Sequence, residues 1–265
     1  MNKKWGHPNE EVTRCDEVWL ENLKQREKEI SEATELESLN VRGDFGSYKV
    51  MLQTEDIEGS QIEAHNNINP AYRVGIIKGI LGEFSPREII DVGCGLGFTT
   101  SVIKRLFPTS EVTGIDLSTD AIAYGEKHFV DCKFVAEAID PSNTEKQYSA
   151  DLICAFEFYP FTRTSQIEDH KNYLNYLMGW LNDGGRLVIL QLWDNEESLS
   201  ANYDELVNDF SEWQFMSYLM PFRRIGAIVQ NRILAVLMSQ LLRPILRALT
   251  GRKIGRNKII IIKRV

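Results

Sequence analysis

The architecture of this chain follows from one short segment, Ile89-Ile90-Asp91-Val92-Gly93-Cys94-Gly95-Leu96-Gly97-Phe98-Thr99-Thr100. The apolar run at residues 88–92 is typical of a buried strand, and three glycines follow it at alternate positions. An amphipathic helix is expected from Phe98 to Phe107, ended by Pro108. Because glycine permits sharp turns and close backbone approach, this corner presents backbone N–H groups beside the positive end of a helix. The segment therefore predicts a site for a polar, nucleoside-bearing ligand.

A second strand is expected at residues 111–116, with Asp116 as its last residue and Ser118 as the cap of the next helix. In a strand–helix–strand unit, Asp116 stands at the carboxyl end of the strand beside the glycine corner. A carboxylate offers two acceptor oxygens, which suits the two hydroxyls of a ribose. The glycine spacing places Phe98 where dinucleotide-binding segments carry a third glycine, and this disfavours a nicotinamide or flavin cofactor.

The acidic residue and three glycines at 91–97 resemble, position by position, the first motif of the class I S-adenosylmethionine-dependent methyltransferases, which have a Rossmann-like fold. Residues 116–118 and the Leu-x-x-Gly-Gly-x-Leu-x-Ile run at 181–189 resemble further segments of that family. The resemblance implies S-adenosyl-L-methionine as the methyl donor and S-adenosyl-L-homocysteine as the product. In the family an acidic residue after the third strand binds the adenine amino group, and Glu137 is preferred here over Asp140. The cofactor-binding residues implied in this way are Asp91, Gly93, Cys94, Gly95, Gly97, Asp116, Leu117, Glu137, Ala138 and Phe156.

The same resemblance implies an α/β fold with a seven-stranded sheet in the order 3-2-1-4-5-7-6, an antiparallel last strand and helices on both faces. The expected parts are an N-terminal helical extension (1–64), the S-adenosylmethionine-binding core (65–221), a helical insertion (222–256) and the last core strand (257–265). Asn69-Pro70 predicts the start of the helix before the first strand. In the family, the segment before the first strand often closes over the cofactor, and the candidates for this role are Tyr48, His65, Tyr72 and Arg73.

The insertion at 222–256 is apolar with a basic rim, and Pro244 is expected to kink it or to divide it into two helices. The sixth strand ends, and the seventh begins, on the side of the sheet where ligands bind, so we expect the insertion to be a lid over the active site. A homodimer face and an interfacial helix on an acidic membrane surface are the alternatives. Residues 221–265 hold eleven of the 30 Lys and Arg residues and none of the 38 Asp and Glu residues, which predicts an anionic partner or contact with the acidic remainder.

The expected reaction is in-line methyl transfer to a small-molecule acceptor, apolar or anionic, most simply at an oxygen. An oxygen nucleophile usually has to lose a proton, and the candidate catalytic bases are Glu157 and His170. Candidate acceptor-binding residues are Tyr159, Arg163 and Arg223. The residues at 157–160 do not match the Asn/Asp-Pro-Pro-Tyr/Phe motif of methyltransferases that act on nucleic-acid amino groups. A non-catalytic S-adenosylmethionine-binding or partner-binding subunit is the alternative function.

The composition limits which binding partners and which cellular compartment we expect. The net charge of −8 and the absence of an aromatic and basic platform outside the insertion argue against nucleic acid. No run of about 18 apolar residues predicts a transmembrane helix, and no apolar leader follows the first lysines. The four cysteines lack metal-type spacing, so we expect free thiols, no metal and a cytoplasmic location.

Overall fold

A computed structural model describes residues 61–143, 148–161, 166–191, 203–221, 231–250 and 258–265 of the chain. The strands are β1 (Glu88–Val92), β2 (Glu111–Asp116), β3 (Lys133–Ala136), β4 (Ala150–Phe156), β5 (Leu181–Gln191), β6 (Trp213–Leu219) and β7 (Lys258–Arg264). The helices are α4 (Gln61–Leu81), α5 (Phe98–Leu106), α6 (Thr119–His128), α7 (Ile167–Gly179), α8 (Tyr203–Leu206), η1 (Val207–Asp209) and α10 (Arg232–Thr250).

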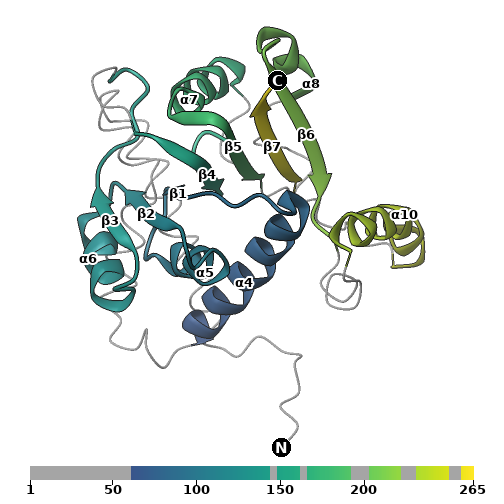
Figure 1. Cartoon of the computed structure of the whole chain (residues 1–265). Helices are drawn as coiled ribbons and strands as arrows, with labels where there is room; N and C mark the ends of the chain where they lie inside the picture. The colour runs from purple at the N-terminus through teal and green to yellow at the C-terminus, as the bar shows by residue number, and fades with distance from the viewer. Residues whose placement is uncertain (1–60, 144–147, 162–165, 192–202, 222–230, 251–257) are drawn as a thin grey trace, which may run out of the picture. The chain divides into compact units, whose positions relative to one another are not determined.

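The seven strands form one sheet in the order β3-β2-β1-β4-β5-β7-β6, which confirms the predicted order (Figure 1). Strands β1 to β5 run parallel, and β7 is antiparallel to both of its neighbours, β5 and β6. The carboxyl ends of β1, β2 and β4 therefore meet at one edge, where ligands bind in open α/β sheets. The strand order reverses at β1: β2 and β3 lie on one side of it, and β4 lies on the other.

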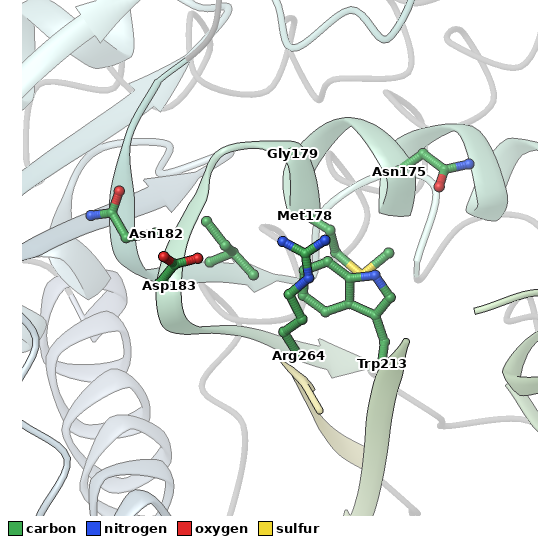
Figure 2. A pocket seen from close by; sticks show the side chains of 8 residues that line it. Asn175, Met178, Gly179, Asn182, Asp183, Trp213 and Arg264 are labelled. Atoms are coloured by element: carbon green, nitrogen blue, oxygen red, sulfur yellow. The ribbon is translucent and has the colours of Figure 1, made fainter. Parts of the chain in front are cut away.

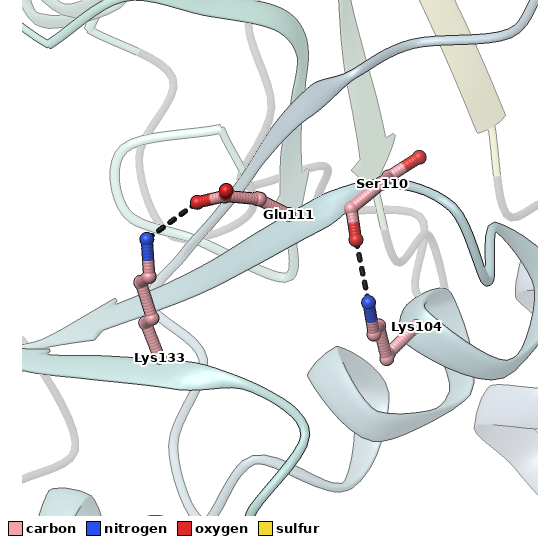
Figure 3. Close-up of polar contacts among 4 residues, drawn as sticks. All are labelled: Lys104, Ser110, Glu111 and Lys133. Atoms are coloured by element: carbon pink, nitrogen blue, oxygen red, sulfur yellow. Dashed lines mark hydrogen bonds and ion pairs between the residues drawn. The ribbon is translucent and has the colours of Figure 1, made fainter.

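The sheet buries apolar side chains on its two faces, as central parallel strands require. One cluster joins α4 and α5 to alternate residues of the central strands, among them Ile89, Leu152, Val188 and Ile261. Their neighbours in sequence point to the other face and are equally buried, for example Ile153. At the amino ends of the strands, polar contacts fix the start of β2. Lys104 Nζ donates to the backbone oxygen of Ser110, and Glu111 pairs with Lys133 of β3 (Figure 3).

One local prediction was wrong, because helix α4 begins at Gln61 and not at Asn69-Pro70. Proline has a helical φ and loses only one hydrogen bond, so a helix can continue through it when both sides favour helix. Helix α10 also continues through Pro244, so the segment is not divided there, and a kink at Pro244 stays a prediction. Strand β5 includes the Gly184-Gly185 pair, and its register with β4 shifts between Ala150 and Leu152.

Helix α10 is the described part of the predicted insertion, and it packs against α4 and β6. Its residues Ala235, Val236 and Ser239 are buried, whereas a row of large apolar side chains along the helix is exposed: Ile233, Leu234, Leu237, Met238, Leu241, Leu242, Ile245 and Leu249. That this segment is a lid stays a prediction. Within the described ranges, no helix is long and apolar enough to cross a membrane, and no group of His, Cys, Asp and Glu could hold a metal ion.

Candidate active site

The glycine corner between β1 and α5 depends on backbone conformations that other residues avoid. Gly93, Gly95 and Gly97 have φ angles of 70°, 54° and 86°, in the left-handed region that favours glycine. Space is also limiting, because a Cβ on Gly93 would lie 2.6 Å from Cδ2 of Phe158 and a Cβ on Gly97 would lie 2.7 Å from the ring of Phe134. All three glycines are therefore required by conformation, and Gly93 and Gly97 are also required by the aromatic rings that approach them.

Asp91, near the end of β1, connects this strand to helix α5 across the glycine corner. Its carboxylate is buried and accepts a hydrogen bond of 2.7 Å from the Thr100 hydroxyl of α5. Burial raises the pKa of Asp91 to about 7, against the lowering effect of the Thr100 bond and with a smaller raising effect from Asp116. The position of Asp91 shows a role in holding β1 and α5 together at the corner. A direct contact with a cofactor stays a prediction.

Asp116, the last residue of β2, is the central acceptor of the site. Its Oδ2 accepts a bond of 2.9 Å from the backbone N–H of Gly95, and its Oδ1 accepts one of 2.9 Å from the N–H of Ser118. Burial raises the pKa of Asp116, while the bonds from Ser118 and Gly95 lower it. These donors, with a smaller contribution from the backbone N–H of Leu117, fix the carboxylate, whose oxygens can accept further hydrogen bonds. This carboxylate can therefore accept two hydroxyl groups at once.

The corner and β2 are also joined through their backbones. The N–H groups of Gly93 and Cys94 donate to the Ile115 carbonyl at 2.7 and 3.1 Å. Cys94 is buried against Gly114, whose Cβ position would lie 2.8 Å from the Cys94 sulfur. Leu117 follows Asp116 directly, and Ser118 then caps α6 by accepting from the N–H of Ala121.

The residues after β3 extend the same edge of the sheet. The N–H of Glu137 donates to the backbone carbonyl of Asp116 at 2.9 Å, so residues Glu137 and Ala138 lie next to Asp116, the candidate ribose-binding residue. The Glu137 carboxylate accepts from the hydroxyl of Tyr148 at 2.8 Å, and Asp140 accepts from Ser142 within its own turn. Which of the two acids meets an adenine stays a prediction.

The end of β4 forms the other half of the site. Phe156 is its last residue, and Glu157 follows with a φ of 57°, the one positive φ among the described residues other than glycine. The Glu157 N–H donates to the Leu190 carbonyl, and its carboxylate forms an ion pair with Arg73 of α4. The ring of Phe158 then lies against Gly93. Helix α4, through Arg73, thus reaches the point where β1 and β4 end.

The two candidate bases are not brought together. His170 of α7 is fully buried, with its Nδ1 3.4 Å from the Tyr203 hydroxyl and its ring against Phe161. Tyr159 is buried and donates to the Asp169 carboxylate at 2.9 Å, so its hydroxyl is engaged within the protein. Arg163 and Arg223 lie outside the described residues, as do Tyr48 and the side chain of His65.

Sequence reasoning missed three side chains at this site: Thr100, Phe134 and Phe158. Phe134 fills the space beside Gly97, Gly114 and Gly125, where a Cβ would lie 2.7 to 3.0 Å from its ring. Glycines at these positions on three different elements are a signal that a large side chain fills the space between them, but the sequence does not say which one.

A groove of about 250 Å³ elsewhere is separate from this site (Figure 2). It is lined by the end of α7, Asn182, Asp183, Trp213 and Arg264, with the Arg264 guanidinium 5.8 Å from the Trp213 ring centre. Trp213 begins β6 and Arg264 ends the antiparallel β7. The groove therefore lies at the end of the sheet opposite to the glycine corner.

Comparison with known proteins agrees with this geometry. Residues 90–187 match the family model described as "Methyltransferase domain". The putative methyltransferase 235L of Invertebrate iridescent virus 6 is 27% identical over 149 residues, 54% of this chain and 52% of that protein. The trans-aconitate 2-methyltransferase of Rhodopseudomonas palustris is 29% identical over 119 residues, 43% of this chain and 42% of that protein. The trans-aconitate 2-methyltransferase of Escherichia coli is 34% identical over 109 residues, 41% of this chain and 40% of that protein. The chain thus spans about half or less of the length of these relatives.

The fold is shared with the plantazolicin methyltransferase BpumL, solved in complex with SAH, at a TM-score of 0.51 and 17% identity over 91% of this chain and 100% of that one. The sheet order, the glycine corner and the match at residues 90–187 identify a class I, Rossmann-like S-adenosylmethionine-dependent methyltransferase domain in this chain.

Proposed function

We propose that this protein transfers a methyl group from S-adenosyl-L-methionine to an oxygen of a small-molecule acceptor. The observation that carries the proposal is the Asp116 carboxylate, fixed by the N–H groups of Gly95 and Ser118 at the carboxyl end of β2. A buried carboxylate whose oxygens can accept further hydrogen bonds offers the acceptors that the two hydroxyls of a ribose diol require. When bound, S-adenosyl-L-methionine supplies a methyl group activated by its positively charged sulfur.

The described residues fit the rest of that cofactor. The glycine corner leaves no room for a Cβ at Gly93 or Gly97, and such close backbone approach suits a ligand held by N–H groups. Residues Leu117, Glu137 and Ala138 surround the backbone carbonyl of Asp116, where an adenine would follow its ribose. The SAH that accompanies BpumL in its solved complex supports the same cofactor here.

Methyl transfer from a sulfonium mainly needs alignment and exclusion of water, because charge is dispersed in the transition state. Phe156, Glu157 and Phe158 occupy the edge of the sheet where β4 ends beside the glycine corner, so they are placed to line the path of the acceptor. The printed name of the R. palustris and E. coli relatives gives a small carboxylic acid, trans-aconitate, as their acceptor. This supports a small molecule and an oxygen nucleophile.

Calorimetry on the full chain with S-adenosylmethionine, S-adenosylhomocysteine and NAD tests the cofactor. We expect the first two to bind and NAD not to bind. Asp116→Asn should weaken binding about 10- to 100-fold, because a hydrogen bond to a charged group is worth about 1.5–3 kcal/mol. Asp120→Asn is the matched control, since Asp120 is exposed in the first turn of α6, and it should leave the affinity unchanged.

A methyl-transfer screen over carboxylic acids, phenols and sugars then tests catalysis. Transfer to any of these acceptors supports the enzyme. Binding of both sulfur ligands without transfer to any of them would favour the non-catalytic subunit, and absence of binding would overturn the proposal.

A further inference from the structure

The ion pair between Arg73 and Glu157 lies at the carboxyl edge of the sheet, beside the glycine corner. Arg73 comes from α4, and Glu157 directly follows β4, whose end pairs with the end of β1 beside the glycine corner. The next residue, Phe158, touches Gly93. The two paired side chains are 27% and 34% exposed, so solvent and small molecules reach them.

Neither candidate base is free to take a proton from an acceptor. The Oε1 atom of Glu157 is bound to the Arg73 guanidinium, and His170 is fully buried among Phe161 and Tyr203. An alcohol or a phenol needs such a base to become a good nucleophile. A carboxylic acid does not, because it is already ionised at neutral pH.

We infer that Arg73 is the binding site for a carboxylate of the acceptor, and that Glu157 holds Arg73 in the absence of the acceptor. This inference rests on the proposed methyl transfer and names the substrate class of that site. The Glu157 carboxylate and an acceptor carboxylate present the same pair of oxygens to a guanidinium, so one can replace the other. A partly exposed ion pair contributes little free energy, so replacing one carboxylate by the other costs little.

The exchange fits the charge balance of the reaction. One carboxylate oxygen of the acceptor stays on Arg73, and the other forms a bond to the methyl carbon. The bond between methyl carbon and sulfur breaks, and its electron pair remains on sulfur. The reacting carboxylate becomes a neutral ester group and the sulfonium becomes a neutral thioether, and no proton moves.

The loss of charge also explains how the product leaves. An ester no longer neutralises the Arg73 guanidinium, whereas Glu157 does, so Glu157 recovers its partner as the ester departs. The positive φ of Glu157, 57°, is a conformation that a residue of this kind rarely adopts. It directs the Glu157 side chain at a functional edge of the sheet, and strained conformations of this sort occur mainly at such places.

Two variants of the full chain separate this inference from a base role for Glu157. The probes are trans-aconitate, succinate and benzoate as acids, with phenol as the neutral acceptor. Their affinity for the protein saturated with S-adenosylhomocysteine is measured by calorimetry, and turnover with S-adenosylmethionine is measured beside it. Arg73→Gln should weaken acid binding and raise KM for acids at least tenfold, with no change in affinity for S-adenosylhomocysteine.

Glu157→Gln should strengthen acid binding and lower KM several-fold, because it removes the competing carboxylate. Between pH 6 and 9, the pH profile of acid turnover should be the same for Glu157→Gln as for the original protein. Arg105→Gln, which removes an exposed arginine of α5, and Glu111→Gln, which breaks the pair with Lys133 at the other end of the sheet, are the matched controls and should change none of these values.

The inference is overturned if Glu157→Gln abolishes kcat with KM unchanged, which is the behaviour of a base. It is equally overturned if Arg73→Gln leaves acid binding intact, or if phenol is methylated and no acid binds the S-adenosylhomocysteine complex. A chain that fails to bind S-adenosylhomocysteine would instead overturn the proposed function itself.

Discussion

Two carboxylates at the same edge of the sheet are held in opposite ways. Asp116 is fixed by two backbone N–H groups, from Gly95 and Ser118, and it is buried. Glu157 is held by one long side chain, Arg73, from a helix 84 residues earlier, and it is partly exposed. The half of the site around β1 and β2 is thus built by backbone and suits a part of a ligand that never varies. The half around β4 and α4 is built by side chains that can exchange partners.

The comparison predicts that changes in the backbone-built half are costly, and the largest effect should come from its buried acid. Burial raises the pKa of Asp91 to about 7 from 3.8, so the folded protein holds a proton that the unfolded chain has released. The free energy of unfolding should therefore fall as pH rises from about 4 to about 7, and then level off. The shift amounts to about 4 kcal/mol at 1.36 kcal/mol per pH unit.

Asp91→Asn removes this dependence, because an amide does not ionise and can still accept from Thr100. Urea unfolding at pH 4.5, 6 and 8 measures the free energy of unfolding. The value for the variant, relative to that for the original protein, should increase as pH rises. Asp131→Asn, at an exposed aspartate before β3, should show no such gain. A constant difference across the three pH values would mean that Asp91 is ionised throughout the range.

A smaller effect is expected at the corner itself. Gly93→Ala places a Cβ at φ 70° and 2.6 Å from Phe158, and we expect a loss of about 2 kcal/mol in the free energy of unfolding from strain alone. Affinity for S-adenosylhomocysteine should fall at least tenfold. Gly179→Ala, at a helical glycine with no atom within 4 Å of its Cβ position, is the control and should be neutral or slightly stabilising.

The contact with Phe158 can be separated from the backbone strain by a double-mutant cycle. Gly93→Ala should cost less in a Phe158→Ala background, because only the strain then remains. Equal costs in both backgrounds would show that Phe158 moves aside freely. The ring would then not be part of the fixed half of the site.

The same contrast explains what the sequence could predict. The glycine corner and Asp116 are encoded by short segments whose residue types are restricted by backbone geometry, and both were predicted from those residues. The strand order was predicted only through the resemblance of these segments to a known family. A glycine at a positive φ leaves a visible trace in the sequence because few other residues can stand there. An acid at a strand end followed by a capping serine leaves a similar trace.

Features that depend on distant side chains left no such trace. The Arg73–Glu157 pair, the ring of Phe134 against glycines of three elements, and the burial of His170 follow from how helices pack on the sheet, which local patterns do not specify. The start of α4 was mispredicted for a related reason. Proline is a reliable helix breaker only where neither side supplies enough helix-favouring residues.

The smallest effect should come from an exposed position on helix α10. Leu241 is 73% exposed, as part of an apolar row on that helix, so Leu241→Gln should change the free energy of unfolding by less than about 0.5 kcal/mol. Val236→Ala, at a buried residue of the same helix, should cost on the order of 1 kcal/mol or more. Urea unfolding at two protein concentrations makes the comparison. A loss above 1 kcal/mol at Leu241 that grows with protein concentration would mean that a second copy covers this row. A loss independent of concentration would mean that the row is covered within one chain.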